Sequence, residues 1–349
     1  MTRPVNSSGM STLSLCMIVK DEEYHLGECL EMARPFVDEV VVVDTGSTDN
    51  TPQIIDRHAD VRGEFEWVDD FAAARNASLE LASSDWVLVL DADERIDPAG
   101  FSAIRAAMRR DEIDGFILKH FNYSDESGLE RFQTDPDNPF SKGYPWYSVV
   151  PILRLFRRRA DIYFVSPIHE IVDPTIAPER IAALNVPIHH YLHGNPAHPR
   201  QDRVLRYLAM MEKELEENPS GRLYGIAGAS ALHFARDYEK AARLLVQAAK
   251  YGYEIPTSLE GVAEANYRGG NYKQAWRIYN ERYDLGSRNA GMCVNMANLA
   301  VRFGDHTRAI ALLEEALALG GLGEEKDAIV RNNIAALRAA AEQPNAKSS

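Results

Sequence analysis

The chain has 349 residues, of which 45% are hydrophobic and 26% charged, and its formal net charge is -14. This composition is ordinary for a soluble globular protein with room for two domains, and no apolar run is long enough to span a membrane. The acidic excess lies in residues 1–200, which hold 33 acidic and 19 basic side chains, so a nucleic-acid partner is disfavoured.

The N-terminal segment and the cysteine pattern both bear on the expected compartment of the protein. The segment 1–12 lacks the apolar stretch of a secretory signal. Cys16, Cys29 and Cys293 are scattered and odd in number, without disulfide or zinc spacing. We therefore expect a cytoplasmic protein with reduced cysteines.

Residues 12–193 alternate short β-rich runs with helical ones, a pattern typical of a parallel sheet covered by helices on both faces. The expected strands cover 13–19, 38–44, 64–68 and 86–90. The expected helices cover 23–36, 51–59 and 71–84. Thr51 is the expected N-cap of the second helix, with Pro52 at its first helical position.

Polar residues follow all four expected strands. They are Lys20-Asp21-Glu22-Glu23, Asp44-Thr45-Gly46-Ser47, Asp69-Asp70 and Asp91-Ala92-Asp93-Glu94. Ligands of such sheets collect at the carboxyl ends of the strands, so this convergence is the first functional signal. An acidic cluster there suits a divalent cation, although a solvated acidic surface is the simpler alternative.

After residue 200 the pattern becomes wholly helical with a period of 34 residues. Three sets of positions keep this spacing: Asp237, Asn271 and Asp305; Tyr238, Tyr272 and His306; Ala241, Ala275 and Ala309. A turn residue, an aromatic ring and a small residue at this period resemble tetratricopeptide repeats. One such hairpin cannot bury its apolar face alone, so we expect the units to stack, with a capping helix after residue 323.

Pro196 and Pro199 mark the expected boundary between the two patterns. The predicted organisation is an α/β domain over 12–195, a linker helix over 196–219 and helical repeats over 220–342.

Asp91 and Asp93 follow the apolar run WVLVL and allow two interpretations. A turn with capping carboxylates explains a D-x-D sequence by itself. At the carboxyl edge of a sheet, the same pair suits Mg²⁺ or Mn²⁺, which would bridge to a diphosphate and neutralise its charge as it departs.

Four segments in this order and spacing resemble family 2 glycosyltransferases with a GT-A fold over about residues 12–195. They are CMIVKDEE, VDEVVVVDTGSTDNT, DDFAAARNASLE and DWVLVLDADE. With the repeats included, the chain is similar to the bacterial subgroup that contains the S-glycosyltransferase of glycopeptide bacteriocins. The resemblance implies a Rossmann-like GT-A domain followed by an all-α tetratricopeptide-like solenoid, and an enzyme that uses a nucleotide sugar.

The resemblance also assigns the donor site. Asp44 matches the acid that contacts the nucleotide base, and Lys20, Glu22 and Glu23 lie in the loop that frames the nucleotide. Asp91 matches the first acid of the D-x-D motif, near the ribose and diphosphate, and belongs to the expected metal site.

Asp93 matches the second acid, the direct metal ligand. Arg75 and Asn76 match an Arg-Asn pair on the preceding helix. Arg75 could hold a phosphate or a carboxylate, or form a structural salt bridge, whereas Asn76 is expected to be structural.

An inverting transfer needs a general base, and this chain has no clear acidic pair downstream of the D-x-D motif. An I-H-E run in 154–173 resembles one in the subgroup, so Glu170 is the predicted base; its alternative is an ion pair with an arginine of 157–159. His169 could orient the acceptor or the diphosphate, or be a buried structural histidine.

The segment 186–194 offers three further histidines. In an extended strand, His189 and His193 would face one way and His190 the other. No cysteine or carboxylate nearby completes a zinc set. The resemblance favours His190 as a third metal ligand, then His193, with strand packing as the alternative for each.

Residues 122–148 predict a long polar loop of the kind that forms lids or binds acceptors. Trp146 and Tyr147 could stack on a sugar or anchor the loop to the core, and the sequence does not separate these roles.

The leading interpretation is a metal-assisted inverting glycosyltransferase that moves a hexose from a UDP-linked donor. The acceptor is a polypeptide side chain, held by the repeats, or a lipopolysaccharide or other cell-envelope glycan. A scaffold with an inactive nucleotide-sugar fold is the non-enzymatic alternative, and the intact Asp44, Asp91 and Asp93 argue against it. A nucleotidyltransferase would need a Gly-rich basic loop, which CMIVKDEE is not. The sugar, the acceptor atom, the metal and the oligomeric state, including a homodimer, stay open.

Overall fold

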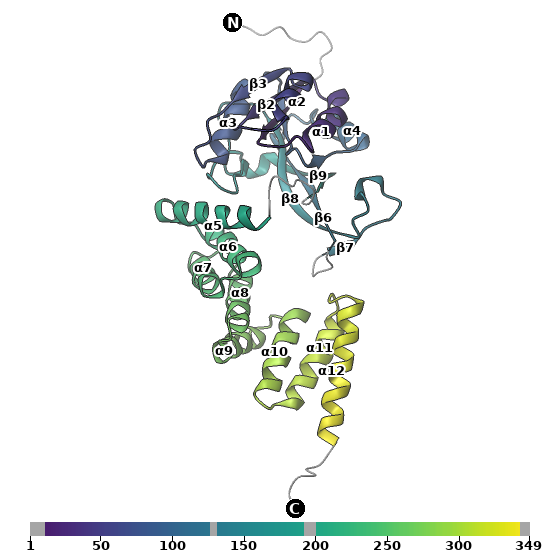
Figure 1. Ribbon diagram of the computed structural model, residues 1–349, viewed down its shortest axis with the longest axis vertical. Helices are drawn as coiled ribbons and strands as arrows, with labels where there is room; N and C mark the ends of the chain where they lie inside the picture. The colour runs from purple at the N-terminus through teal and green to yellow at the C-terminus, as the bar shows by residue number, and fades with distance from the viewer. Residues whose placement is uncertain (1–10, 126–130, 192–199, 343–349) are drawn as a thin grey trace, which may run out of the picture. The chain divides into compact units, whose positions relative to one another are not determined.

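The computed structural model describes residues 11–125, 131–191 and 200–342 (Figure 1). The chain divides into two compact units, 1–199 and 200–349. The first is an α/β unit and the second is helical. His193 and the expected domain boundary at 195 lie outside the described residues.

The α/β unit is built on a nine-stranded sheet in the order β3-β2-β1-β4-β8-β6-β9-β5, with β7 paired to β8. Its strands are β1 (Leu13–Val19), β2 (Glu39–Asp44), β3 (Val61–Glu64), β4 (Trp86–Val89), β5 (Glu94–Arg95), β6 (Gly115–Ser124), β7 (Arg131–Gln133), β8 (Trp146–Arg157) and β9 (Ile181–His190).

The strands β1 to β4 run parallel, whereas β8 runs antiparallel to both β4 and β6. The expected parallel pairing is therefore correct for β1 to β4 and for β6 with β9, but not for β8. No α-helix separates β6 from β8 in the described chain, and parallel neighbours require a long crossover of that kind. The predicted loop over 122–148 is wrong at both ends, because 122–124 belong to β6 and 146–148 to β8.

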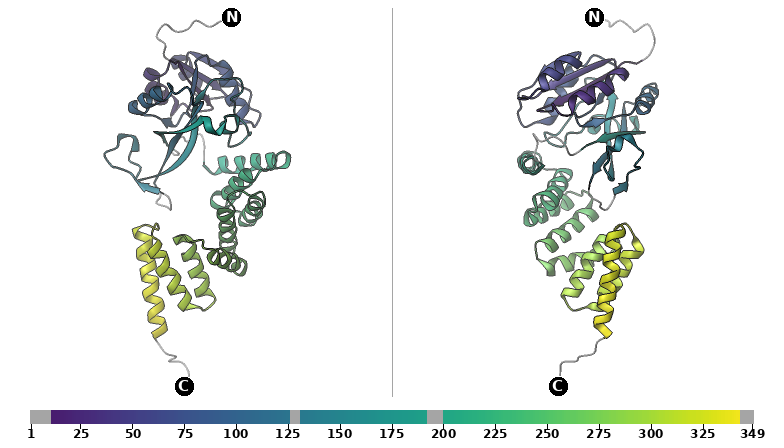
Figure 2. Two further views of the ribbon diagram at one scale, coloured as in Figure 1. Left: turned by 180° about the vertical axis from the view of Figure 1, so that it is seen from behind. Right: turned by 45° about the vertical axis from the view of Figure 1, so that its right-hand side comes forward.

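Helices cover both faces of the sheet (Figure 2). They are α1 (Leu26–Ala33), α2 (Thr51–His58), α3 (Phe71–Leu81) and α4 (Pro98–Ala107). Leu13, Leu15 and Met17 of β1 point into a core formed with α1, α2 and α4. Cys16 points to the opposite face, where α3 and residues 162–176 close a second core. The alternation along β1 thus produces three layers.

Two local predictions need correction. The third strand covers Val61–Glu64 rather than 64–68, because its partner β2 ends at Asp44, opposite Glu64. Asp69 and Asp70 therefore do not end a strand; Asp70 caps α3 by accepting a hydrogen bond from the Ala73 amide at 2.8 Å.

The second correction concerns the start of α2. Asn50 occupies the N-cap position, Thr51 is the first helical residue and Pro52 the second. The Thr51 hydroxyl is buried and accepts a hydrogen bond from the Glu22 amide at 2.7 Å, so it links two loops and does not cap the helix.

The helical unit consists of paired helices. They are α5 (Arg200–Glu217), α6 (Gly221–Ser230), α7 (Tyr238–Lys250), α8 (Ile255–Arg268), α9 (Tyr272–Asp284), α10 (Ala290–Arg302), α11 (His306–Leu319) and α12 (Glu324–Glu342). The helix predicted for 201–219 is α5 and belongs to this unit.

The 34-residue spacing has a direct structural meaning. Asp237, Asn271 and Asp305 are the N-cap residues of α7, α9 and α11. Ala241, Ala275 and Ala309, four residues later, are fully buried where successive helices pack. Within the described chain, no helix combines the length and apolarity needed to cross a bilayer.

Candidate active site

A network of carboxylates, arginines and histidines lies at the carboxyl end of β4. Asp91 follows this strand, and both of its carboxylate oxygens accept hydrogen bonds from arginines. Arg75 of α3 donates to Oδ1 at 2.6 Å, and Arg154 of β8 donates to Oδ2 at 2.9 Å. Both arginines are at least 90% buried. Burial raises the pKa of Asp91, but the two guanidinium groups outweigh it and hold that pKa well below its usual range.

Glu94 is the most deeply buried carboxylate of this network. It is fully buried, and its Oε2 accepts a hydrogen bond from the Asp91 amide at 2.9 Å. Its Oε1 lies 2.7 Å from His120 Nε2 and 3.3 Å from Arg154 Nη2. Burial opposes ionisation of Glu94, but Arg154 lowers its pKa to about 2. The Glu94 carboxylate therefore stays anionic at neutral pH.

Asp93 points to a different partner from Asp91. Its Oδ2 lies 3.3 Å from His190 Nε2 at the end of β9. The other ring nitrogen, Nδ1, lies 2.6 Å from Asn122 Oδ1, and the ring stacks on His120 with centroids 4.5 Å apart. Burial lowers the pKa of His190, but the hydrogen bond with Asp93 outweighs it, and the net shift is upward.

Glu170 approaches the network from a tight loop. Val165 and Ile171 form an isolated antiparallel bridge, and Ser166 and His169 adopt left-handed backbone angles of φ 73° and 53°. Such angles are uncommon outside glycine and mark a constrained turn. The turn places Glu170 Oε1 3.0 Å from Arg75 Nε.

Arg75 therefore bridges Glu170 and Asp91, whereas Asn76 has a structural role. The Asn76 side chain donates to the Phe164 carbonyl at 2.9 Å and accepts from the Phe164 amide at 2.8 Å. The alternative partner for Glu170, an arginine of 157–159, is not used: Arg157 and Arg159 bind Asp114, and Arg158 donates to the Ser84 carbonyl.

The residues predicted to frame the nucleotide lie in two loops that bind each other. Asp44 is buried and its Oδ1 accepts hydrogen bonds from the amides of Gly46 and Ser47. Lys20 Nζ donates to the Gly46 carbonyl at 3.3 Å. Glu23 Oε2 accepts from the amide and side chain of Asn50. With the bond from the Glu22 amide to Thr51, these contacts join the loops after β1 and β2.

The donor set at this edge fits a divalent cation through two side chains. Asp93 offers a carboxylate oxygen and His190 an imidazole nitrogen close to it. Both Asp91 oxygens are engaged by arginines. Across the residues that the structure describes, no group of three or more His, Cys, Asp or Glu forms a complete metal cage. Mg²⁺ is commonly held by one or two protein ligands together with substrate phosphates and water, and this pair suits that mode.

Sequence reasoning missed Arg154 and His120, and it named Glu94 only as a polar residue after a strand. Arg154 in ILRLF and His120 in ILKHF were visible as polar residues next to apolar strand residues. The signal was a charged or titratable side chain at a position where a buried strand calls for an apolar one. Such a residue requires a buried partner, but the sequence does not say which.

Tyr147, from the predicted loop, and His189 of β9 pack against other aromatic rings. Tyr147 stacks on Phe121 with centroids 4.7 Å apart. His189 is buried, and its Nδ1 lies 2.8 Å from the Tyr123 hydroxyl. Burial lowers the pKa of His189 to about 4, so it is neutral at pH 7.

A pocket of about 460 Å³ opens beside Tyr191, the residue that follows His190. Residues from the start of α1, the end of β6, the segment before β8 and the end of β9 line it. They include Tyr24, Glu28, Asp125, Lys142, Tyr144 and Tyr191. The Tyr191 amide donates to the Asp93 carbonyl at 3.2 Å, so the pocket wall is bonded to the D-x-D segment.

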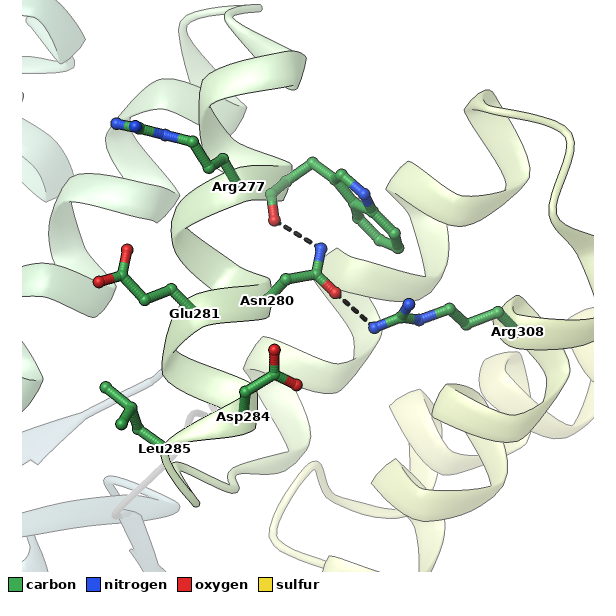
Figure 3. A pocket seen from close by; sticks show the side chains of 7 residues that line it. Arg277, Asn280, Glu281, Asp284, Leu285 and Arg308 are labelled. Atoms are coloured by element: carbon green, nitrogen blue, oxygen red, sulfur yellow. Dashed lines mark hydrogen bonds between the residues drawn. The ribbon is translucent and has the colours of Figure 1, made fainter.

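The helical unit has a hollow of its own, of about 670 Å³, between α9 and α11 (Figure 3). Its lining includes Trp276, Arg277, Asn280, Glu281, Asp284 and Arg308. Arg308 binds the Asn280 side chain and lies over the Trp276 ring, 5.0 Å from its centroid. The wall therefore combines an aromatic ring with two arginines and two carboxylates.

Comparison with known proteins identifies the family. The model of glycosyl transferase family 2 matches residues 14–166. The lipopolysaccharide core biosynthesis glycosyltransferase LpsC of Rhizobium meliloti is 36% identical over 59% of this chain and 67% of its own length.

Two further relatives are matched over less of their length. A TPR repeat-containing protein of Synechococcus elongatus is 32% identical over 71% of this chain and 59% of its own. The SPbeta prophage-derived glycosyltransferase SunS of Bacillus subtilis is 29% identical over 47% of this chain and 35% of its own. The chain thus spans between a third and three fifths of these two proteins. The predicted GT-A domain followed by a helical solenoid is confirmed, and the chain belongs to glycosyltransferase family 2.

Proposed function

We propose that this chain transfers a hexose from a UDP-linked sugar to an acceptor nucleophile with inversion at the anomeric carbon. One observation carries the proposal: Arg75 binds both the first carboxylate of the D-x-D motif, 16 residues away, and Glu170, 95 residues away. A proton acceptor and a donor-binding carboxylate are thereby held on a single buried guanidinium.

In the proposed reaction, the bond from the acceptor atom to the anomeric carbon forms while the bond from that carbon to the diphosphate oxygen breaks. The acceptor proton passes to Glu170, and the bonding electron pair leaves with the diphosphate. Arg75 fixes the Glu170 carboxylate through Oε1. Arg154 and Arg75 keep Asp91 ionised beside the donor site.

Asp93 and His190 are the residues that would hold a divalent cation, Mn²⁺ or Mg²⁺. The cation would neutralise charge on the leaving diphosphate. Asn122 and His120 set the orientation of the His190 ring. Such outer contacts fix which ring nitrogen faces a metal. Asp44 and the joined loops after β1 and β2 would bind the nucleotide.

The acceptor is either a glycan or a polypeptide side chain. LpsC is named for lipopolysaccharide core biosynthesis, which favours a glycan. The hollow lined by Trp276 and Arg308 favours a polypeptide that the helical unit would hold. A half-buried aromatic ring and two arginines are residue types that recur in protein-binding surfaces.

The test is nucleotide release by the purified protein from UDP-glucose, UDP-galactose, UDP-N-acetylglucosamine and GDP-mannose, with Mn²⁺, with Mg²⁺ and with EDTA. Asp93→Ala would run beside the unchanged protein, and Asp137→Asn, an exposed carboxylate away from the site, is the matched control. Release that requires both metal and Asp93 supports the proposal. Absence of release together with absence of a UDP-dependent thermal shift would favour the inactive scaffold.

A further inference from the structure

We propose that the pocket beside Tyr191 is the acceptor site and that it takes a neutral saccharide. This inference rests on the proposed function and names its acceptor class. The pocket of about 460 Å³ is of a size typical of small-ligand sites and larger than any single amino-acid side chain.

The pocket is connected to the D-x-D segment through Tyr191. Tyr191, which lines it, follows His190 directly and donates its amide to the Asp93 carbonyl. His25 also lines it, and its backbone carbonyl accepts a hydrogen bond at 2.8 Å from Arg95, two residues after Asp93. A ligand in this pocket therefore contacts Tyr191, which follows His190 in the chain and is hydrogen-bonded to the Asp93 backbone.

The charges around the pocket are matched within the wall. Lys142 Nζ lies 2.8 and 2.7 Å from the two oxygens of Glu28. Buried Arg95 donates to Glu28 Oε2 from beneath at 3.1 Å. Asp125 adds one more carboxylate, so the lining carries two carboxylates and one ammonium, and Arg95 compensates Glu28 from beneath.

The balance of charge excludes strongly charged ligands. A phosphate group would meet the carboxylates of Glu28 and Asp125, and a cationic side chain would have to compete with Lys142 for Glu28. Burial lowers the pKa of His25, so this ring adds no positive charge at pH 7. A ligand with hydroxyl groups can donate to Asp125 and Glu28 without carrying charge itself.

The aromatic wall supplies flat apolar surfaces of fixed orientation. The Tyr191 hydroxyl donates to the Phe140 carbonyl at 2.8 Å, and its ring stacks on Tyr123 with centroids 5.5 Å apart. Tyr144 packs on the same ring of Tyr123 at 6.1 Å. Tyr24 stands at the rim with 65% of its surface exposed. The C–H face of a sugar ring packs on such aromatic rings while its hydroxyls reach carboxylates.

The experiment is saturation-transfer NMR of the full chain with UDP and the diamagnetic cation Mg²⁺ present. The probes are glucose, galactose, N-acetylglucosamine, maltose and lactose, with glucose 6-phosphate and an uncharged serine-, threonine- and cysteine-containing peptide as comparators. The variants are Tyr24→Ala and Asp125→Asn. The matched controls are Tyr163→Ala and Asp137→Asn, which alter exposed residues of the same unit outside the pocket.

We expect at least one neutral saccharide to bind, and each pocket variant to weaken it about five- to tenfold, as expected for one lost hydrogen bond or ring contact. The two controls should bind it as the unchanged protein does. Equal binding by pocket variants and controls, preference for the phosphorylated sugar, or binding of the peptide alone would each overturn the inference. A UDP-dependent thermal shift in the same samples separates this failure from failure of the proposed glycosyl transfer.

Discussion

Aspartates in the two units of this protein bind partners at very different separations along the sequence. In the helical unit, Asp237 and Asp305 accept hydrogen bonds from amides three residues ahead in the chain. In the α/β unit, Asp91 binds arginines 16 and 63 residues away. The difference shows that an aspartate stabilises local structure when its hydrogen-bond partners are close in sequence. The same residue type becomes part of a candidate reactive site when the fold brings distant charged residues to it.

The two kinds of aspartate also differ in what their removal leaves behind. A capping carboxylate is exposed, so water can replace it at the freed amide. A strand-end carboxylate of the network faces buried guanidinium groups, which water reaches poorly. Substitutions in each unit can therefore test the comparison.

The largest effect is expected for Asp93→Ala. Loss of one of two proposed metal ligands should reduce metal-dependent nucleotide release about a thousandfold or more, because charge on the leaving diphosphate would no longer be neutralised. The thermal midpoint should change little, since part of Asp93 is exposed. Release that persists at the level of Asp137→Asn would contradict the proposed role of Asp93.

The next largest effect is expected for Arg75→Met and is a loss of folding stability. This change leaves Asp91 and Glu170 without a shared buried partner and should cost about 3–5 kcal/mol of unfolding free energy. Urea unfolding followed by tryptophan fluorescence measures it. Arg62→Met is the control, because Arg62 forms a more exposed pair with Asp56, worth about 0–1 kcal/mol. Equal losses in both variants would mean that the Arg75 network is not stabilising.

Glu170→Gln should have an effect on rate. The amide cannot take the acceptor proton, so transfer should fall about a hundredfold, within the range of general-base contributions. Its carbonyl oxygen can still accept the hydrogen bond from Arg75, and UDP binding with Mn²⁺ should persist in a thermal-shift assay. Glu179→Gln, an exposed residue of the same segment, is the control. Unchanged transfer by Glu170→Gln would move the role of base to another residue.

The smallest effect is expected in the helical unit. Asp305→Ala removes a cap bond to the Arg308 amide and should cost about 1 kcal/mol of stability without changing nucleotide release. Asn271 holds the equivalent position, but its side chain donates to Asn266 instead of capping α9. Asn271→Ala should therefore cost less than Asp305→Ala. A larger loss in Asn271→Ala would show that the turn contact matters more than the cap.

Local patterns explain why much of the fold was predictable. β1 is found where the apolar run predicts it, and the 34-residue period marks the starts of α7, α9 and α11. The third strand was misplaced because its limit is set by the end of β2 and not by its own residues. The antiparallel pairing of β8 was missed because it is set by contacts with β4 and β6, which are distant in sequence, and not by the residues of β8 itself.

The sequence by itself determined the family, the two patterns of secondary structure and the candidate carboxylates Asp91, Asp93 and Glu170, because motifs and periods are properties of short segments. Only the tertiary structure decided that Arg75 joins Asp91 to Glu170, that Arg154 and His120 complete the network, and how closely the His190 ring lies to Asp93. Those contacts join residues from separate strands and loops, and a buried charge selects its partner by position in space, which no local pattern records.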